Sequence, residues 1–178
     1  MTIVTRSHVG LSSLLSIFLV NALAFAAEPA AKMAGSQATN AAGAAWAESS
    51  PFVGRWHRNR AQSTLPPGEP SPSDLVSEIS RADGSVTWSV TIVTPDGQPH
   101  VVTFDAAANG ESHRVSSDTT ASVRLTGNAL QTTFKGPAGR SDAQTCTVSA
   151  DQLKMTCKGV LTDGAGHTAS YVDVYDRM

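Results

Sequence analysis

The sequence predicts an all-β domain in which an antiparallel meander of about eight to ten short strands closes into a barrel. From Pro51 onward the chain is rich in Thr, Val and Ser, and turn signals recur about every 8 to 12 residues. No stretch of this region shows the apolar period of about 3.6 residues that marks an amphipathic helix. Closing the meander removes exposed edge strands, which favours a barrel. A two-sheet β-sandwich is the alternative, because its strands give similar signals.

The first 26 residues predict an export signal. Arg6 precedes an apolar run that begins at Leu11, and Ala24 and Ala26 bracket Phe25 in a cleavage-type pattern. The run is interrupted by Ser and Asn and is short for a membrane span of about 20 residues, although a retained anchor is the alternative. We therefore expect a cleaved protein without a stable membrane anchor, in the periplasm or outside the cell.

Residues 27–50 predict a flexible spacer, because this Ala/Gly/Ser-rich stretch has too few apolar side chains to offset the entropy of ordering it. One domain, residues 51–178, remains. The chain carries 13 basic and 15 acidic side chains, and loss of the signal removes one of the basic ones. A mildly acidic chain without Lys/Arg clusters excludes the electrostatic pattern of a nucleic-acid-binding protein, so we expect no nucleic-acid partner.

The first half of the domain contains the clearest strand, Ser85–Thr94. In it, apolar side chains such as Trp88 alternate with Ser and Thr, which is typical of a strand with one buried face. The turn Pro95-Asp96-Gly97 follows, and Phe104 lies in phase on the returning strand. The Pro-rich stretch 65–73 predicts a loop. The strands expected in this half cover residues 52–59, 74–83, 85–94, 99–106 and 111–117.

The second half repeats this pattern. Gly127-Asn128 and Gly136-Pro137 supply turns between Thr/Val-rich segments. The strands expected here cover residues 120–126, 129–135, 140–150, 152–162 and 166–176.

Two cysteines, Cys146 and Cys157, flank a turn in the hairpin near the end of the chain. If Asp151 and Gln152 form its loop, the cysteines lie directly opposite each other, with Cβ atoms about 4.5–5.5 Å apart. Other turn lengths would shift this register. Export and the shared hairpin favour a structural disulfide, since no CxxC spacing suggests redox activity and no nearby histidines suggest zinc.

A Gly-x-Trp sequence opens the domain, and an arginine lies near the end of its last strand. These residues are Gly54, Trp56 and Arg177. With the Thr/Val-rich meander between them, the domain resembles lipocalins and their calycin relatives, in particular small secreted bacterial lipocalin-like domains. The resemblance implies that Trp56 packs at the closed end of a barrel and that Arg177 crosses its ring. The Thr-Asp-Tyr motif and the C-terminal helix of lipocalins are missing from this sequence, and a tryptophan that is only a core residue is the alternative interpretation.

Sequence motifs for catalysis or metal binding are missing from the domain. Its histidines, His57, His100, His113 and His167, show no HExxH or HxH spacing, and no G-x-S-x-G occurs. We therefore expect no metal and no cofactor. Groups that assemble far apart in sequence could still build an enzyme, which stays open as an alternative.

The favoured function is an exported, non-enzymatic protein that holds a small apolar ligand in the barrel. The candidate interior residues are Trp88, Phe104, Leu125, Phe134 and Met155. Their alternative role is to fill a dry core, in which case the domain is a protein-interaction module or an inhibitor in the cell envelope, with an unidentified protein partner.

Overall fold

The computed structural model describes residues 50–66 and 68–178, and all of their strands belong to one antiparallel sheet. The strands are β1 (Gly54–Arg58), β2 (Asp74–Ala82), β3 (Ser85–Val93), β4 (Pro99–Ala107), β5 (Asn109–Arg114), β6 (Thr120–Thr126), β7 (Ala129–Lys135), β8 (Ser141–Val148), β9 (Lys154–Thr162) and β10 (Thr168–Arg177). The helical content of these residues is one short 3-10 turn, η2 (Pro137–Gly139). The predicted signal, residues 1–26, and all but the last residue of the predicted spacer, 27–50, lie outside the described residues.

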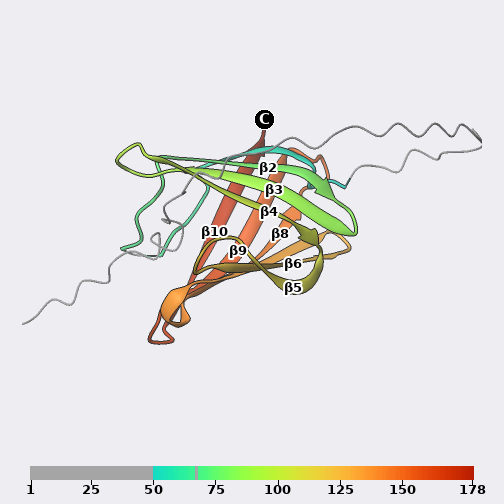
Figure 1. The fold of residues 1–178 in the computed structure, drawn as a ribbon. Helices are drawn as coiled ribbons and strands as arrows, with labels where there is room; N and C mark the ends of the chain where they lie inside the picture. The colour runs from blue at the N-terminus through green and yellow to red at the C-terminus, as the bar shows by residue number, and fades with distance from the viewer. Residues whose placement is uncertain (1–49, 67) are drawn as a thin grey trace, which may run out of the picture.

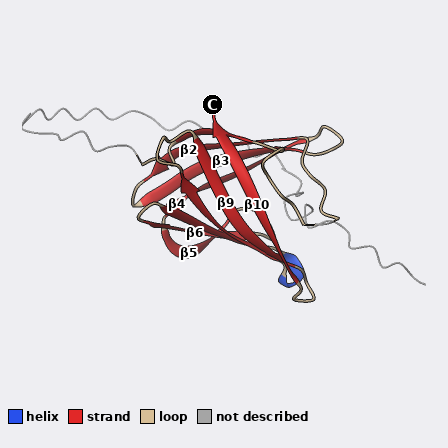
Figure 2. Ribbon diagram, turned by 180° about the vertical axis from the view of Figure 1, so that it is seen from behind, coloured by secondary structure: helices blue, strands red, loops and turns tan. Residues whose placement is uncertain are grey.

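The sheet, in the order β4-β3-β2-β1-β10-β9-β8-β7-β6-β5, curls into a nearly closed barrel (Figures 1 and 2). The predicted antiparallel barrel is therefore confirmed, and the strands do not separate into the two sheets of a sandwich. Each predicted strand overlaps an observed one, and the observed strands are mostly shorter because the residues at their ends are used in turns.

The first and last strands of the chain pair in the middle of the sheet. β1 runs antiparallel to β10, with Trp56 opposite Arg177 and Arg58 opposite Tyr175. All other neighbours in the sheet are consecutive in the chain and form hairpins. β4 and β5 are the two edges of the sheet, although Ala108 alone separates them along the chain.

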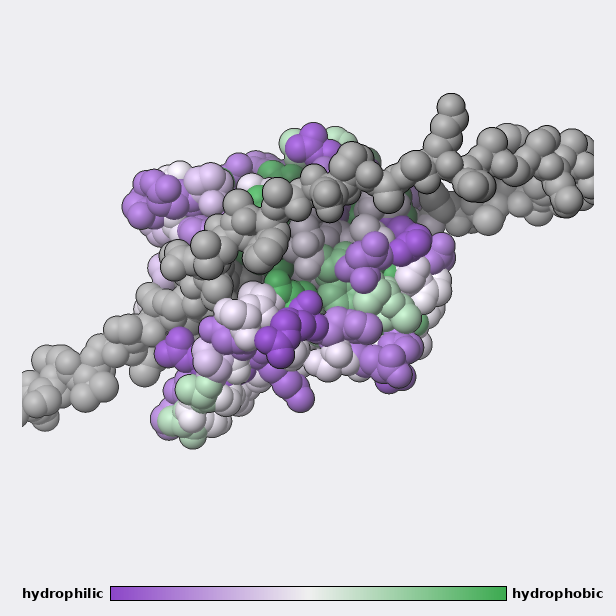
Figure 3. Space-filling model, viewed as in Figure 1, coloured by the Kyte–Doolittle hydropathy of each residue, from purple (hydrophilic) through white to green (hydrophobic). Residues whose placement is uncertain are grey.

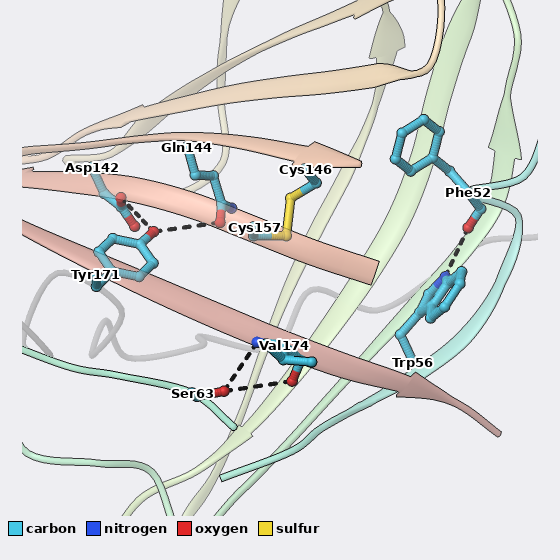
Figure 4. Close-up of a disulfide and its surroundings, with 9 residues drawn as sticks. All are labelled: Phe52, Trp56, Ser63, Asp142, Gln144, Cys146, Cys157, Tyr171 and Val174. Atoms are coloured by element: carbon cyan, nitrogen blue, oxygen red, sulfur yellow. Dashed lines mark hydrogen bonds between the residues drawn. A yellow bond between two sulfur atoms is a disulfide. The ribbon is translucent and has the colours of Figure 1, made fainter. Parts of the chain in front are cut away.

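Side chains from the start of the domain, Phe52 and Trp56, fill one end of the barrel. Phe52 and Trp56 are fully buried, and the Trp56 indole N–H donates to the Phe52 carbonyl at 2.8 Å (Figure 4). The guanidinium carbon of Arg177 lies 4.1 Å from the centroid of the Trp56 ring. Arg177 also donates to the carbonyls of Pro51 and Val53, at 2.7 Å and 2.8 Å. The segment before β1 is thereby fixed to the end of β10.

Gly54 is required by this arrangement. Its φ of 145° lies in the region that favours glycine, and a Cβ atom there would overlap the Arg177 guanidinium. A glycine two residues before the tryptophan therefore leaves the space in which the arginine crosses the ring.

The predicted disulfide between Cys146 and Cys157 is confirmed, and so is the register on which it depended. The two cysteines are directly opposite each other on β8 and β9, as are Val148 and Met155. The hairpin turn is longer than the expected two-residue loop, because Ser149 closes it by hydrogen bonding to Lys154. The extra residues are shared equally by both sides, so the register is unchanged.

Candidate functional site: the barrel cavity

The inside of the barrel contains a cavity of about 170 Å³. Apolar side chains line most of it, and they come chiefly from β2, β3, β4, β7 and β9. Figure 3 shows apolar residues at the centre of one face of the molecule, with hydrophilic residues around them. An apolar hollow with a few polar groups is the usual form of a small-molecule site.

Strand alternation builds the apolar wall. On β3, Val86, Trp88 and Ile92 are buried, while the Ser and Thr residues between them are partly exposed. The Trp88 ring stacks on Phe104, with centroids 5.7 Å apart, and meets the edge of Phe134 at 5.8 Å. These ring contacts hold the Trp88 side chain in one position on the wall.

The structure brings three of the five predicted interior residues together around the cavity. Trp88, Phe134 and Met155 line it. Phe104 is buried, but it packs against Trp88 and the edge of His113 and is not part of the lining. Leu125, on β6, is half-buried against the core and does not line the cavity either.

Part of the cavity lining, called the polar wall below, consists of polar groups on β1, β8 and β10 that no sequence motif indicated. Its first part is a buried ion pair between Arg58 of β1 and Asp173 of β10, which are 5% and 9% exposed. Arg58 Nε donates to Asp173 Oδ1 at 2.5 Å, and Arg58 Nη1 donates to the Ser71 hydroxyl at 3.2 Å. Because a buried charge is costly without a partner, each member of the pair holds the other in place.

Its second part is a hydrogen-bonded group on β8 and β10 (Figure 4). The Tyr171 hydroxyl donates to Asp142 Oδ1 at 2.7 Å, and it also lies 3.4 Å from Gln144 Oε1. Strand β9 runs between β8 and β10, and its Gly159 is directly opposite both Tyr171 and Gln144. A Cβ atom on Gly159 would overlap the Tyr171 ring, so this glycine lets the ring cross β9 and reach the carboxylate.

The acid–base properties of this wall follow from its burial. The pKa of Asp142 is raised from 3.8 to about 6, mainly by burial; the hydrogen bond from Tyr171 lowers it, and the negative charge of Asp173 adds to the rise. Burial also raises the pKa values of the Tyr171 and Tyr175 hydroxyls. Both tyrosines are therefore protonated at neutral pH and remain hydrogen-bond donors.

The connection from β1 to β2 crosses one end of the cavity. Leu65, Glu69, Pro70 and Pro72 of this connection are part of the lining. It is attached to β10 through Thr64, whose backbone forms hydrogen bonds of 2.7 Å and 3.0 Å with Val172. A second attachment joins the Ser63 hydroxyl to the backbone of Val174 (Figure 4). The predicted Pro-rich loop thus forms one boundary of the cavity.

The four histidines that the structure describes, His57, His100, His113 and His167, are not part of the cavity lining. His57 pairs with Asp74 at 2.7 Å and His167 with Asp163 at 2.8 Å, both at the surface. In residues 50–66 and 68–178, no group of three or more His, Cys, Asp or Glu side chains could hold a metal ion. No helix in the same residues is long and apolar enough to span a membrane.

No protein-family model and no curated protein matches the sequence. Among solved structures, a zebrafish ileal bile acid-binding protein complexed with cholic acid is 21% identical, with a TM-score of 0.48 over 72% of this chain and 100% of that one. A mutant of the fluorescent protein UnaG is 20% identical, with a TM-score of 0.48 over 72% of this chain and 96% of that one. A mutant of the REP1-NXSQ fatty acid transporter is 15% identical, with a TM-score of 0.46 over 72% and 98%. Similarities at this level do not bear on what this chain binds.

Proposed function

We propose that this chain is an exported binding protein that holds one small, mainly apolar ligand inside its barrel. The cavity carries this proposal, because protein interiors are normally packed with few voids larger than a water molecule. An engineered apolar cavity of about 150 Å³ binds benzene, so a volume of about 170 Å³ holds one ring or a short chain. A longer ligand would extend past the β1–β2 connection.

The residues proposed to contact the ligand are Trp88, Phe134 and Met155, which supply apolar side chains to the cavity lining. Phe104 and Leu125 are proposed to act from behind that wall, where they support the residues that line it. The cavity argues against a filled core and therefore favours ligand binding over a protein-interaction module.

Export is the other part of the proposal. The expected signal in residues 1–26 supports it, and so does the disulfide between Cys146 and Cys157, since disulfides persist in the periplasm and outside the cell. The proposed location is the periplasm or the cell exterior.

Calorimetric titration with two uncharged probes, octanol and naphthalene, tests the binding function. Val90 lines the cavity and is half-buried, so Val90→Trp fills the space with an indole ring. Val101→Trp is the matched control, because Val101 is 61% exposed on β4. We expect saturable binding at one site in the wild type and in Val101→Trp, and none in Val90→Trp. Failure of both probes to bind the wild type, or equal binding to Val90→Trp, would refute the proposed function.

A further inference from the structure

More acidic than basic side chains line the cavity. Among the described residues, Arg58 is the basic member of the lining, and Glu69, Asp142 and Asp173 are the acidic members. The guanidinium of Arg58 is engaged by Asp173 and Ser71. Asp142 is held by the neutral hydroxyl of Tyr171 and has no cationic partner in the described part of the chain.

Asp142 points into the cavity. Inward-facing residues alternate along β8, and Asp142 is in phase with Gln144 and Cys146, which also line the cavity. The residues directly opposite it are apolar, Phe134 on β7 and Leu161 on β9. Strand β10 presents Tyr171, Asp173 and Tyr175 to the same cavity, β1 presents Arg58, and the β1–β2 connection presents Glu69.

We infer that the cavity selects amphiphiles with a protonated amine as their polar end and discriminates against those with a carboxylate; this inference rests on the proposed binding function. An ionised carboxylate accepts hydrogen bonds through two oxygens and about four lone pairs, and Tyr171 is the donor that Asp142 has in the described structure. An ammonium group supplies the further donors and the missing positive charge. A ligand carboxylate would place a second negative charge beside Asp142 in a site of low dielectric constant.

The ionisation of Asp142 gives this selectivity a pH dependence. Since burial raises the pKa of Asp142 to about 6, the carboxylate is largely ionised at pH 7.5 and largely protonated near pH 5. Preference for an amine over an uncharged analogue is therefore expected at the higher pH and should weaken at the lower one.

A matched series of octylamine, octanol and octanoate tests the inference by calorimetric titration at pH 7.5 and pH 5. We expect octylamine to bind the wild type about tenfold or more tightly than octanoate at pH 7.5, as a charge-assisted hydrogen bond implies. Asp142→Asn should reduce this ratio to about twofold or less. Asp105→Asn removes a carboxylate that is 66% exposed on β4 and should leave the ratio unchanged.

The possible failures are distinguishable. Octanoate binding as tightly as octylamine overturns the inference but leaves the proposed function intact, and so does an amine preference that survives in Asp142→Asn. Lack of saturable binding by all three probes refutes the proposed function and the inference with it. Amine binding that persists in Val90→Trp lies outside the cavity and also overturns the inference.

Discussion

Replacing Asp142 by Asn should remove a pH dependence of stability that the folded barrel imposes. Burial raises the pKa of this carboxyl from 3.8 to about 6. Because the folded state binds the proton more tightly, the stability that Asp142 contributes is fully present below about pH 3.8 and is lost as the pH rises through about 6. A shift of about two pKa units corresponds to about 3 kcal/mol, at about 1.36 kcal/mol per unit.

The measurement is urea unfolding of the wild type and of Asp142→Asn at about pH 4 and about pH 8. Asn keeps the oxygen that accepts from Tyr171 and carries no charge at either pH. Relative to the variant, the wild type should lose about 2–3 kcal/mol of unfolding free energy between the two pH values. Asp105→Asn reports the effect of losing an exposed carboxylate. A constant difference between wild type and Asp142→Asn would show that Asp142 is well solvated and would refute the buried polar wall.

Further predictions concern the packing that holds the two walls. Trp56→Ala should lower the unfolding free energy by about 3–5 kcal/mol, because the ring is fully buried, and a loss below about 1 kcal/mol would contradict its role at the barrel end. Gly159→Ala should lower the unfolding free energy measured in urea by about 1–3 kcal/mol, because the new Cβ overlaps the Tyr171 ring. This loss should be smaller when Tyr171 is also replaced by Ala, and an equal loss would contradict the passage of the Tyr171 ring across Gly159. Replacing Cys146 and Cys157 together by Ala should cost about 2–3 kcal/mol, as expected for a cross-link across 11 residues, and an unchanged thermal midpoint would contradict this.

Features that depend on local pattern were predictable from the sequence. The alternation around Trp88 identifies a strand with one buried face, because side chains on a strand point to opposite sides in turn. The register of Cys146 with Cys157 was predictable because the observed longer turn is centred at the same place as the expected two-residue loop. A barrel was predictable because a helix-free meander must deal with its edges.

The polar wall was not predictable from motifs, because its members lie on different strands and meet only when the sheet forms. Arg58 and Asp173 are 115 residues apart in the chain and meet because β1 pairs with β10. A usable signal was present nonetheless. Asp142 is four residues before Cys146, so the alternation that turns the disulfide inward also turns this carboxylate inward.

Which apolar side chains line the cavity could not be predicted from the sequence either. Phe104 is in phase with the interior, yet its ring stacks on Trp88 and does not line the cavity. Strand alternation predicts on which face a side chain lies, but the packing of neighbouring rings decides which side chains reach the open space.

Native mass spectrometry of the full chain, purified without detergent and then extracted with solvent, tests the central claim most directly. We expect one apolar small molecule per chain in the wild type and in Val101→Trp, and an unliganded mass for Val90→Trp. An unliganded wild type, even after incubation with a lipid extract, would contradict the claim that the cavity holds a ligand. The same adduct on Val90→Trp would contradict its location.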